Sequence, residues 1–406
     1  MKFIPSDLIK RPVYLERIKP FINKRIIKVL TGQRRVGKSY LLFQIMAYIQ
    51  DKNPDASIIY INKEDLTFSH LKNSKDLNDY IQQQSVNYKT NYVFIDEIQD
   101  IENFQDALRS LLLDENIDLY CTGSNANLLS GDIAGVLSGR FIETKVYSLS
   151  YVEFLNFHQL KNQSKSLELY MKYGGLPYLK HLPLEDEVVF EYLKNIYTTI
   201  LYRDIINRYN IRKTSLLEKL VIFLADNTGS LFSAKKISDF LKSQHIKIAP
   251  NQVQQYIFYL VSSFIIHEVK RFDIKGKKIF EINDKYYFEN LGIRNAIWGY
   301  RLQDRGKIME NMVYNHLIFL NYEVKVGKLS NKEIDFIAEK NANYFYFQVA
   351  LSINNEKTLK REFENLMAIG DNYPKYIITM EKFEGVGNKG IKCIDLKSFL
   401  NLNKLS

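Results

Sequence analysis

Short apolar runs alternate with amphipathic segments along the first third of the chain. The runs have the length and composition of buried strands, and they lie at residues 26–30, 57–61, 92–95, 117–122 and 143–147. After the first run, the apolar residues from Tyr40 to Met46 follow helical spacing. Strands that alternate with helices favour a parallel sheet. The pattern therefore predicts an α/β domain over residues 1–150.

The pattern changes after residue 150. Residues 151–211 have helical spacing, which is interrupted at Gly174-Gly175-Leu176-Pro177. Residues 212–300 contain the apolar faces of three helices, followed by two strand-like runs around Lys275-Gly276-Lys277-Lys278. Three helices followed by a hairpin predict a winged-helix domain.

A glycine-rich segment joins the first predicted strand to the first helix. Its sequence, Gly32-Gln33-Arg34-Arg35-Val36-Gly37-Lys38-Ser39, has the G-x-x-x-x-G-K-[ST] spacing of a phosphate-binding loop. The glycines would let backbone N–H groups approach the phosphates of a nucleotide. Lys38 would reach the β- and γ-phosphates, and the Ser39 hydroxyl would bind Mg²⁺. The helix that opens at Tyr40 would direct its positive end at the same phosphates, so we expect residues 32–40 to contact the nucleotide.

Two adjacent acidic residues, Asp96 and Glu97, follow the strand at 92–95. Because ligands of doubly wound sheets bind at the carboxyl ends of the strands, both residues would lie beside the phosphate loop. Asp96 would hold Mg²⁺, directly or through water, and Glu97 would orient and deprotonate the attacking water. The alternative is a strand that ends in a solvated acidic turn.

Further catalytic candidates lie near the fourth and fifth strands. Ser124 and Asn125 could contact the γ-phosphate or the attacking water, or they could cap a helix that begins near Ala126. Arg140 is a candidate for stabilising transition-state charge, either within one chain or across a subunit interface. A solvated or carboxylate-paired Arg140 is the alternative.

Four segments, TGQRRVGKS, YVFIDEIQD, CTGSNANLL and LSGRFIETKVYSLSYVEF, together resemble the bacterial and archaeal AAA+ ATPases that carry a second conserved domain of unknown function. The resemblance extends through Tyr173–Pro177 and Leu201–Ile205, and so covers nearly the whole chain. It implies a P-loop NTPase sheet, ATP and Mg²⁺ binding, slow hydrolysis, and a relation to regulatory ATPases of signalling and defence. It also implies that residues 151–211 form the helical lid of the AAA module.

Basic residues are concentrated in the predicted winged helix. The chain has 56 Lys and Arg against 46 Asp and Glu, and residues 212–290 contain 13 of the former and 8 of the latter. The basic residues of the expected wing are Lys270, Arg271, Lys275, Lys277 and Lys278. This cluster is a candidate contact surface for double-stranded DNA. The overall charge of +10 is compatible with such a partner, although abundant lysine alone can produce it.

The candidate recognition helix gives less support for DNA binding. Residues 250–264 contain no Lys or Arg. Gln252 and Gln255 could read adenine edges, but the aromatic residues of this helix are more simply explained as core. The alternative is therefore a winged helix that packs against a protein partner.

Residues 301–406 predict a second α/β domain with the element order αβββαβ. This order, together with Glu310, Asp335 and the triplet Gln348-Val349-Ala350, resembles the PD-(D/E)xK restriction-endonuclease-like fold. In that fold a helix acid, a strand Asp and a Glu-x-Lys triplet hold Mg²⁺ and activate water. Here Gln348 replaces the acidic ligand and Ala350 replaces the lysine, so we expect the cleavage chemistry to be lost. Candidate replacements on the next helix are Lys357, Lys360 and Glu362.

Composition limits the cellular context. The 406 residues are 46% hydrophobic, with 28 Tyr and 25 Phe, and can supply several packed cores. Cys121 and Cys393 have neither metal-ligand spacing nor a disulfide pattern. No apolar run approaches the length of a membrane span and no secretion signal is recognisable, so we expect a cytoplasmic protein.

The combined prediction is a Mg²⁺-dependent ATPase whose nucleotide state regulates the binding of DNA or a protein partner by the C-terminal domains. One alternative is a nucleotide-loaded signalling switch with little turnover. Another is an ATP-coupled DNA nuclease. The oligomeric state is left open.

Overall fold

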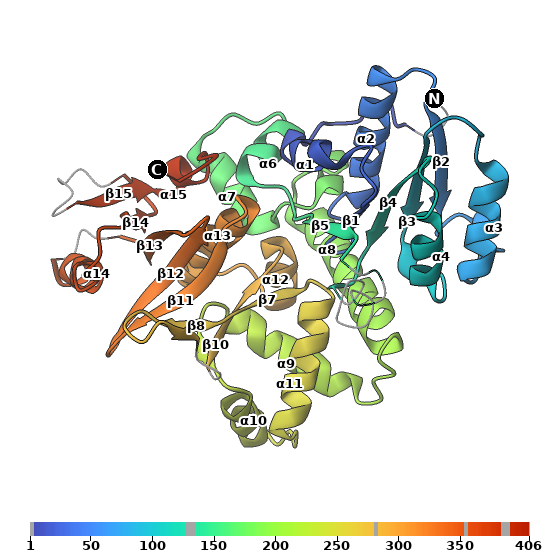
Figure 1. Ribbon diagram of the computed structural model, residues 1–406. Coiled ribbons are helices and arrows are strands. Elements are labelled where there is room, and N and C mark those ends of the chain that lie inside the picture. The colour runs from blue at the N-terminus through green and yellow to red at the C-terminus, as the bar shows by residue number, and fades with distance from the viewer. Residues whose placement is uncertain are drawn as a thin grey trace. The chain divides into compact units, whose positions relative to one another are not determined.

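The computed structural model describes residues 4–126, 135, 137, 139–279, 283–352, 356–382 and 390–405, with the backbone alone at 356–359. The chain forms two compact units. The first contains Met1–Tyr147 and Ser262–Phe264, and the second contains Ser148–Val261 and Ile265–Ser406. Figure 1 shows the elements of both units.

The first unit is built on a five-stranded parallel sheet. Its strands are β1 (Ile27–Thr31), β2 (Ser57–Asn62), β3 (Asn91–Asp96), β4 (Ile117–Gly123) and β5 (Phe141–Lys145). They lie in the order β2-β3-β4-β1-β5, and every neighbouring pair is parallel. The first four strands agree with the predicted apolar runs within one residue, and β5 begins and ends two residues before the fifth run. The prediction of a parallel α/β sheet is thus confirmed, and the sheet is consistent with a P-loop NTPase fold.

Amphipathic helices pack on this sheet. They are α1 (Pro12–Ile18), α2 (Lys38–Lys52), α3 (Ser74–Gln84) and α4 (Phe104–Leu111), with 3₁₀ turns η1 (Lys19–Phe21), η2 (Leu66–Phe68) and η3 (Ile98–Asp100). In α4 the buried residues Phe104, Ala107, Leu108 and Leu111 follow the spacing of one helix face. They form one apolar cluster with Leu77 of α3 and with alternate residues of β1 to β4.

The second unit begins with helices. They are α6 (Tyr151–Phe157), α7 (Ser164–Tyr173), the 3₁₀ helix η5 (Pro177–His181) and α8 (Asp186–Thr199), which continues as the π-helix η6 (Ile200–Asn207). The predicted break at Gly174-Gly175 separates α7 from η5. Glycine is required there because Gly174 has a φ of +69° and a Cβ on Gly175 would lie 2.4 Å from the carbonyl oxygen of Leu149.

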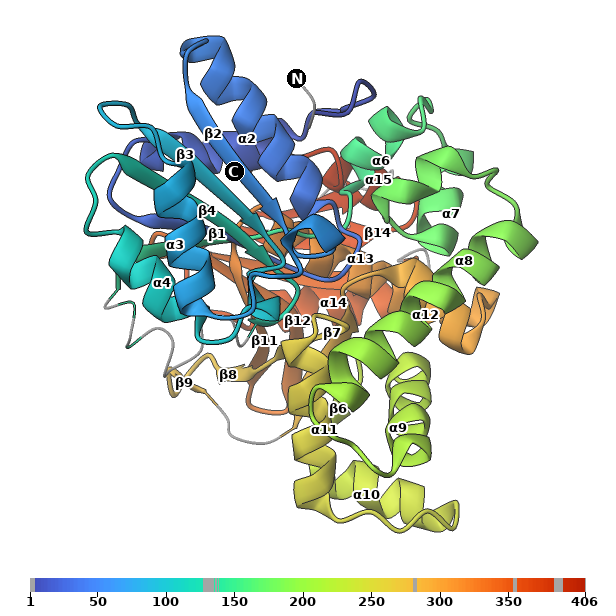
Figure 2. The ribbon, with the colours of Figure 1, turned by 90° about the vertical axis from the view of Figure 1, so that its right-hand side faces the viewer.

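A second helical group surrounds a small antiparallel sheet. The helices are α9 (Thr214–Asp226), α10 (Ala234–Ser243), α11 (Pro250–Ser262) and α12 (Leu291–Trp298). The strands are β6 (Leu231–Phe232), β7 (Ile266–Val269) and β10 (Asp284–Phe288), in the order β6-β10-β7. Figure 2 shows α9, α10 and α11 lying together.

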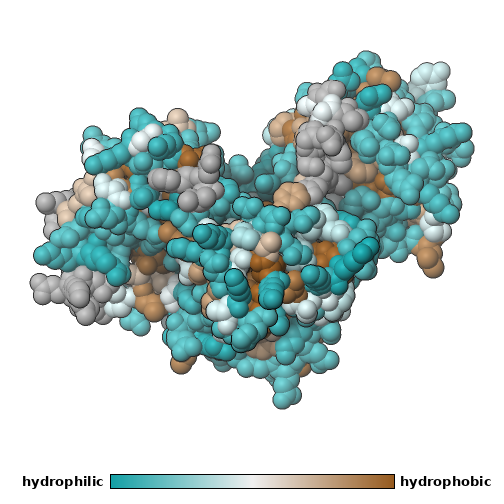
Figure 3. Space-filling view, turned by 90° about the horizontal axis from the view of Figure 1, so that it is seen from below, coloured by the Kyte–Doolittle hydropathy of each residue, from teal (hydrophilic) through white to brown (hydrophobic). Residues whose placement is uncertain are grey.

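Most of the surface in Figure 3 is hydrophilic, with apolar patches between polar side chains.

The last part of the second unit is a seven-stranded mixed sheet with the order β15-β14-β13-β12-β11-β8-β9. Its strands are β8 (Arg271–Asp273), β9 (Lys278–Ile279), β11 (Glu323–Leu329), β12 (Lys332–Lys340), β13 (Asn343–Ala350), β14 (Lys375–Thr379) and β15 (Ile391–Asp395). The accompanying helices are η7 (Leu302–Asp304), α13 (Arg305–Phe319), α14 (Glu356–Met367) and α15 (Leu396–Phe399).

The hairpin predicted around Lys275–Lys278 forms, but it belongs to this larger sheet. β8 and β9 are antiparallel, and β8 pairs in parallel with β11 through Arg271 and Val326. Backbone hydrogen bonding to β11 therefore joins the hairpin to strands that lie beyond residue 300. Within the described residues, no helix is long and apolar enough to cross a membrane.

Candidate functional site

The phosphate loop and the two acidic residues lie at the same edge of the first unit's sheet. β4 is inserted between β1 and β3, and its end at Gly123 is level with Thr31 of β1. The loop leaves β1 directly after Thr31, and Asp96 is the last residue of β3. The ends of three adjacent strands therefore supply the site.

Glycine is needed at both ends of the phosphate loop. Gly32 has a φ of +149°, and a Cβ there would lie 2.1 Å from the carbonyl oxygen of Val146. Gly37 has a φ of +94° and directly precedes α2. Other residues are strained in these conformations. The loop thus leads into the positive N-terminal end of a 15-residue helix.

Lys38 lies over the loop. Its Nζ donates hydrogen bonds to the carbonyl oxygens of Gly32 and Gln33, both over 3.0 Å. The same nitrogen lies 3.9 Å from Oε1 of Glu97. The structure therefore brings together the lysine and the acid that the sequence assigned to one site.

Asp96 is buried among hydroxyl groups. It accepts hydrogen bonds from Ser39, Thr122 and, over 3.3 Å, the Tyr60 phenol. Burial raises the pKa of Asp96, while the bonds from Ser39 and Thr122 oppose this effect. The predicted Mg²⁺ ligands Ser39 and Asp96 are therefore hydrogen-bonded to each other. A hydroxyl and a carboxylate in contact are oxygen ligands of the kind that Mg²⁺ takes, so these residues fit the ion.

Glu97 has a conformation that is unusual for a residue other than glycine, with a φ of +56°. Its backbone N–H donates to the Thr122 hydroxyl over 2.9 Å, and its carboxylate accepts from Gln99. Burial alone would raise the pKa of Glu97, but Lys38, Gln99 and Arg34 hold that pKa below its ordinary value. The carboxylate is therefore ionised near neutral pH, as a general base requires.

The other predicted nucleotide contacts differ in exposure. Gln33 and Val36 are buried, and Arg34 is buried with its Nη1 3.1 Å from Oε1 of Glu64. Arg35 is exposed, and Tyr40 is 42% exposed at the start of α2.

Ser124 and Asn125 are buried directly after β4, at the edge that carries the phosphate loop. The helix expected from Ala126 falls largely on residues 127–134, outside the described residues. The capping alternative for Ser124 and Asn125 therefore stays a prediction, as does their contact with the γ-phosphate.

Arg140 lies at the opposite edge of the sheet. It immediately precedes β5, and its carbonyl oxygen accepts a hydrogen bond from the N–H of Ile27, the first residue of β1. Because the phosphate loop follows the last residue of β1, the length of this strand separates Arg140 from the loop. This placement argues against a role of Arg140 in its own chain's site. The subunit-interface and solvated alternatives remain predictions.

Three side chains of the site were not anticipated. The Thr122 hydroxyl joins Asp96 to the backbone of Glu97, and the Tyr60 phenol contacts Asp96 from β2. Arg11 is buried and donates from Nη1 to the carbonyl oxygen of Val36 over 3.0 Å. Thr122 could have been found as a polar residue near the end of β4, but no sequence signal connects Arg11 with the loop.

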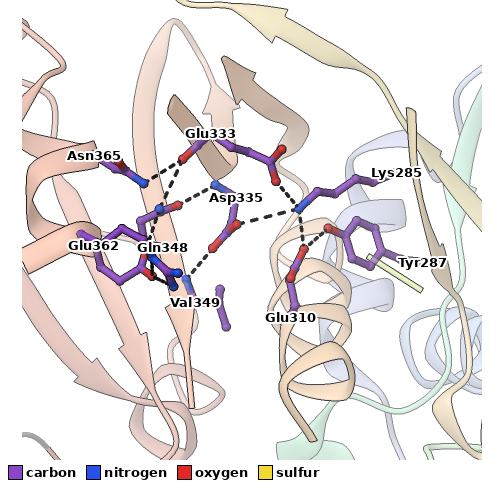
Figure 4. Close-up of polar contacts among 10 residues, drawn as sticks. Lys285, Tyr287, Glu310, Glu333, Asp335, Gln348, Val349, Glu362 and Asn365 are labelled. Atoms are coloured by element: carbon purple, nitrogen blue, oxygen red, sulfur yellow. Dashed lines mark hydrogen bonds and ion pairs between the residues drawn. The ribbon is translucent and has the colours of Figure 1, made fainter. Parts of the chain in front are cut away.

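A second polar cluster surrounds the residues predicted to resemble a nuclease centre (Figure 4). Glu310 comes from α13, Asp335 from β12 and Gln348 from β13. The Oε1 atom of Gln348 accepts from the N–H of Asp335 over 2.7 Å, and Oδ2 of Asp335 accepts from the N–H of Val349 over 2.8 Å. The structure therefore brings the predicted residues together.

Two residues of β10 complete this cluster. Nζ of Lys285 lies 2.9 Å from Oε1 of Glu310, 2.8 Å from Oε1 of Glu333 and 3.8 Å from Oδ1 of Asp335. The Tyr287 hydroxyl donates to Oε1 of Glu310 over 2.6 Å. No role was predicted for Lys285 or Tyr287, because both precede the nuclease-like segment in the sequence.

Burial and the neighbouring charges both shift the pKa values of this cluster. Burial raises the pKa of Asp335 to about 8, Glu310 adds to the increase, and Lys285 opposes it. Burial would lower the pKa of Lys285, but Glu310, Asp335 and Glu333 raise it above the ordinary value of a lysine. Lys285 is therefore a permanent cation.

The candidate replacements on α14 have different positions. The carboxylate of Glu362 accepts from Nε2 of Gln348 over 2.8 Å. Lys360 is exposed, with its Nζ 3.9 Å from Glu364, and the side chain of Lys357 lies outside the described residues. In the part of the chain that is described, no group of three or more His, Cys, Asp and Glu side chains is arranged to hold a metal ion.

The basic residues of the hairpin region are not equivalent. Lys270 forms ion pairs with Glu268 at 3.0 Å and Asp284 at 2.9 Å. Lys275, Lys277 and Lys278 are exposed. The exposed part of the predicted DNA surface is thus concentrated at the β8–β9 turn.

Comparisons with known proteins bear on both units. A family model described as "AAA domain" matches residues 24–155, and one described as "Domain of unknown function (DUF8612)" matches residues 164–304. The first match contains all five strands of the parallel sheet and agrees with the predicted AAA-type ATPase domain.

Relatives align along most of the chain. An uncharacterized protein of Haemophilus influenzae is 36% identical over 401 residues, which are 97% of this chain and 98% of the relative. An uncharacterized protein of Methanocaldococcus jannaschii is 30% identical over 338 residues, which are 79% of this chain and 73% of the relative. A Walker-type ATPase of Pyrococcus abyssi has a similar fold, with a TM-score of 0.50 at 16% identity over 71% of this chain and 95% of that chain.

Proposed function

Because this chain belongs to the family of its Haemophilus influenzae and Methanocaldococcus jannaschii relatives and its first unit is an AAA-type P-loop ATPase domain, we propose that it is a Mg²⁺-dependent ATPase. The observation that carries the proposal is the position of Lys38 and an ionised Glu97 at one edge of the sheet, 3.9 Å apart. A cation for phosphate and a base for water are the two side chains that hydrolysis of ATP requires there.

Each residue of this site has a proposed role. Residues 32–40 hold the phosphates, with Lys38 directed at the β- and γ-phosphates. Ser39 and Asp96 hold Mg²⁺, which would neutralise phosphate charge. Glu97 orients and deprotonates the attacking water, and Asn125 assists at the γ-phosphate.

The experiment is phosphate release from Mg²⁺-ATP by the full chain. We expect release to disappear in Lys38→Ala and in Glu97→Gln, whereas the exposed Glu102→Gln should match the unchanged protein. Steady turnover in both site variants would reject the assignment. Running the assay with and without double-stranded DNA also tests whether DNA controls turnover.

A nucleotide-loaded switch is the second candidate. The contact between Lys38 and Glu97 favours it, because an ammonium beside a carboxylate lowers the basicity of that carboxylate. A switch would retain ATP through gel filtration and release less than one phosphate per chain. Repeated turnover would exclude the switch and leave the ATPase.

For the second unit we propose a helical lid at 151–211, a winged helix at 212–300 and a nuclease-like domain without cleavage activity at 301–406. The β8–β9 hairpin of the proposed winged helix extends the sheet of the nuclease-like domain. The succession α9, β6, α10, α11 and then β7 and β10 supports the winged helix, because three helices precede an antiparallel strand pair. The exposed lysines of the β8–β9 turn support DNA as the partner. Binding of a protein partner is the alternative outcome.

A further inference from the structure

The ammonium of Lys285 occupies the centre of a carboxylate cluster (Figure 4). Its distances to Glu310 and Glu333, 2.9 and 2.8 Å, are those of charge-assisted hydrogen bonds. The lysine side chain is 4% exposed, so water does not provide most of its solvation. These carboxylates therefore serve as the counter-charge of Lys285.

A divalent cation could not share this position. Mg²⁺ binds oxygen ligands at about 2.0–2.1 Å in near-octahedral geometry. An ion bound to Glu310 and Asp335 would lie close to Nζ of Lys285, which already contacts both carboxylates. Repulsion between two cations is strong where little water screens them. Lys285 and a metal ion are therefore alternatives at this centre.

The oxygens that would bind the ion have other hydrogen-bond donors. Oδ2 of Asp335 accepts from the N–H of Val349, and Oε1 of Glu310 accepts from the Tyr287 hydroxyl. The amide oxygen of Gln348 accepts from the N–H of Asp335. These three oxygen atoms therefore have hydrogen-bond donors within the protein.

Gln348 fits this arrangement better than a glutamate would. Its amide nitrogen donates to the buried carboxylate of Glu362 over 2.8 Å. A glutamate at this position could not donate that bond when ionised and would place a second negative charge beside Glu362. The amide also removes one negative charge from the centre, which suits a monovalent cation.

We propose that Lys285 takes the place of the metal ion in this nuclease-like centre. Its ammonium joins β10, the central strand of the small sheet, to α13 and β12. The cluster then connects these three elements of the second unit without a metal ion. This proposal does not depend on the ATPase, because every residue involved lies in residues 265–406.

The competing role for Lys285 is that of the catalytic lysine missing at Ala350. That role requires a metal ion beside the lysine, whereas the proposed role excludes it. Metal binding therefore distinguishes the two roles without an activity assay.

The test is a count of Mn²⁺ bound to the full chain without nucleotide, measured from the electron paramagnetic resonance signal of free Mn²⁺. We expect the unchanged protein and Asp335→Asn to bind the same number of ions, because Mn²⁺ held by the first unit is common to both. One ion more in the unchanged protein than in Asp335→Asn would overturn the proposal.

Removal of the Lys285 ammonium should allow a metal ion to bind among these carboxylates. Lys285→Ala should bind one additional Mn²⁺ per chain, and the double variant with Asp335→Asn should lose it. Lys325→Ala is the matched control, because Lys325 also joins two carboxylates, Glu323 and Glu339, but outside this centre. A folded Lys285→Ala protein without the additional ion would also overturn the proposal. If Lys285→Ala does not fold, the number of Mn²⁺ ions bound by the unchanged protein and by Asp335→Asn tests the proposal alone.

Discussion

The guanidinium of Arg11 donates a hydrogen bond to the backbone carbonyl of Val36, inside the phosphate loop, over 3.0 Å. Its second amino group donates to the carbonyl oxygen of Tyr147, also over 3.0 Å. One buried side chain therefore connects the loop to the segment that follows β5. Arg11 does not belong to the loop motif, yet it supports the conformation of the loop.

Replacing Arg11 with Met should weaken ATP binding about tenfold, which corresponds to about 1.4 kcal/mol. The variant removes both hydrogen bonds and leaves the carbonyl oxygens of Val36 and Tyr147 without this donor. Titration with a fluorescent ATP analogue would measure the change. Arg17→Met is the control, because Arg17 lies over the same Tyr14 ring from the last turn of α1. Equal affinity in the two variants would show that the bond to Val36 is unimportant for binding.

Replacing Thr122 with Val should destabilise the protein by about 1–3 kcal/mol, the cost of leaving a buried polar group unsatisfied. The variant keeps the shape but removes the hydroxyl that bonds both Asp96 and the N–H of Glu97. The unfolding temperature and the rate of phosphate release should both decline. Thr122→Ser keeps the hydroxyl and should retain most stability and turnover. A fully active Thr122→Val protein would contradict the role assigned to this bond.

Arg140 should act, if it is catalytic, only across a subunit interface. Mixing the inactive variants Lys38→Ala and Arg140→Ala should then restore phosphate release, because a site with an intact Lys38 can receive Arg140 from the other chain. Turnover of the mixture is compared with that of each variant alone. An Arg140→Ala variant with full activity would favour a solvated arginine.

Replacing Lys275, Lys277 and Lys278 with Ala should weaken binding of double-stranded DNA at all sequences. These lysines are exposed. The plot of log K against log salt has a negative slope, and removing one lysine that neutralises a phosphate makes that slope shallower by about 0.9. Fluorescence anisotropy at several salt concentrations would measure the slope. Substitution of three exposed lysines in the first unit, Lys72, Lys75 and Lys89, tests the effect of charge alone. An equal loss of affinity in both triple variants would remove the support for a specific surface at the hairpin.

His316 should make the protein sensitive to acid. Burial lowers the pKa of its ring to about 4, against about 6.5 in an unfolded chain. The unfolded chain therefore binds a proton that the folded chain excludes, and stability that is complete above about pH 6.5 decreases as the pH falls toward 4. The full effect is about 3 kcal/mol.

Urea unfolding at neutral and acidic pH would measure this loss. His316→Gln, which can still donate toward the carbonyl oxygen of Leu402, should lose less stability on acidification than the unchanged protein. His70→Gln, at an exposed position, should lose as much as the unchanged protein. A parallel loss in all three proteins would show that other groups cause the acid sensitivity.

The sequence predicted the first unit well because its signals are local. A buried strand, a glycine-rich loop and a helix follow one another directly, and the acidic pair ends another buried strand. Parallel pairing then brings these strand ends to one edge. The position of Arg140 follows from the same rule, because a residue that precedes a parallel strand lies at the amino edge. Of the two roles considered for Arg140, within one chain or across an interface, this rule favours the second.

The rest of the site depends on contacts between distant segments. No periodicity connects Arg11 with Val36, and the lysine that joins Glu310 to Glu333 is on a strand of another predicted domain. Composition likewise marked the β8–β9 hairpin as basic without showing that it extends the sheet of β11. Such contacts are set by tertiary packing, which local propensity does not encode.

The close approach of Gly32 to Val146 limits where the nucleotide unit can be cut from the chain. The N–H of Val146 donates to the carbonyl oxygen of Thr31 over 2.7 Å, and Tyr147 accepts the second bond from Arg11. A fragment that ended at Lys145, the last residue of β5, would lack Val146, whose carbonyl oxygen packs against Gly32. An excised nucleotide unit must therefore extend through Tyr147.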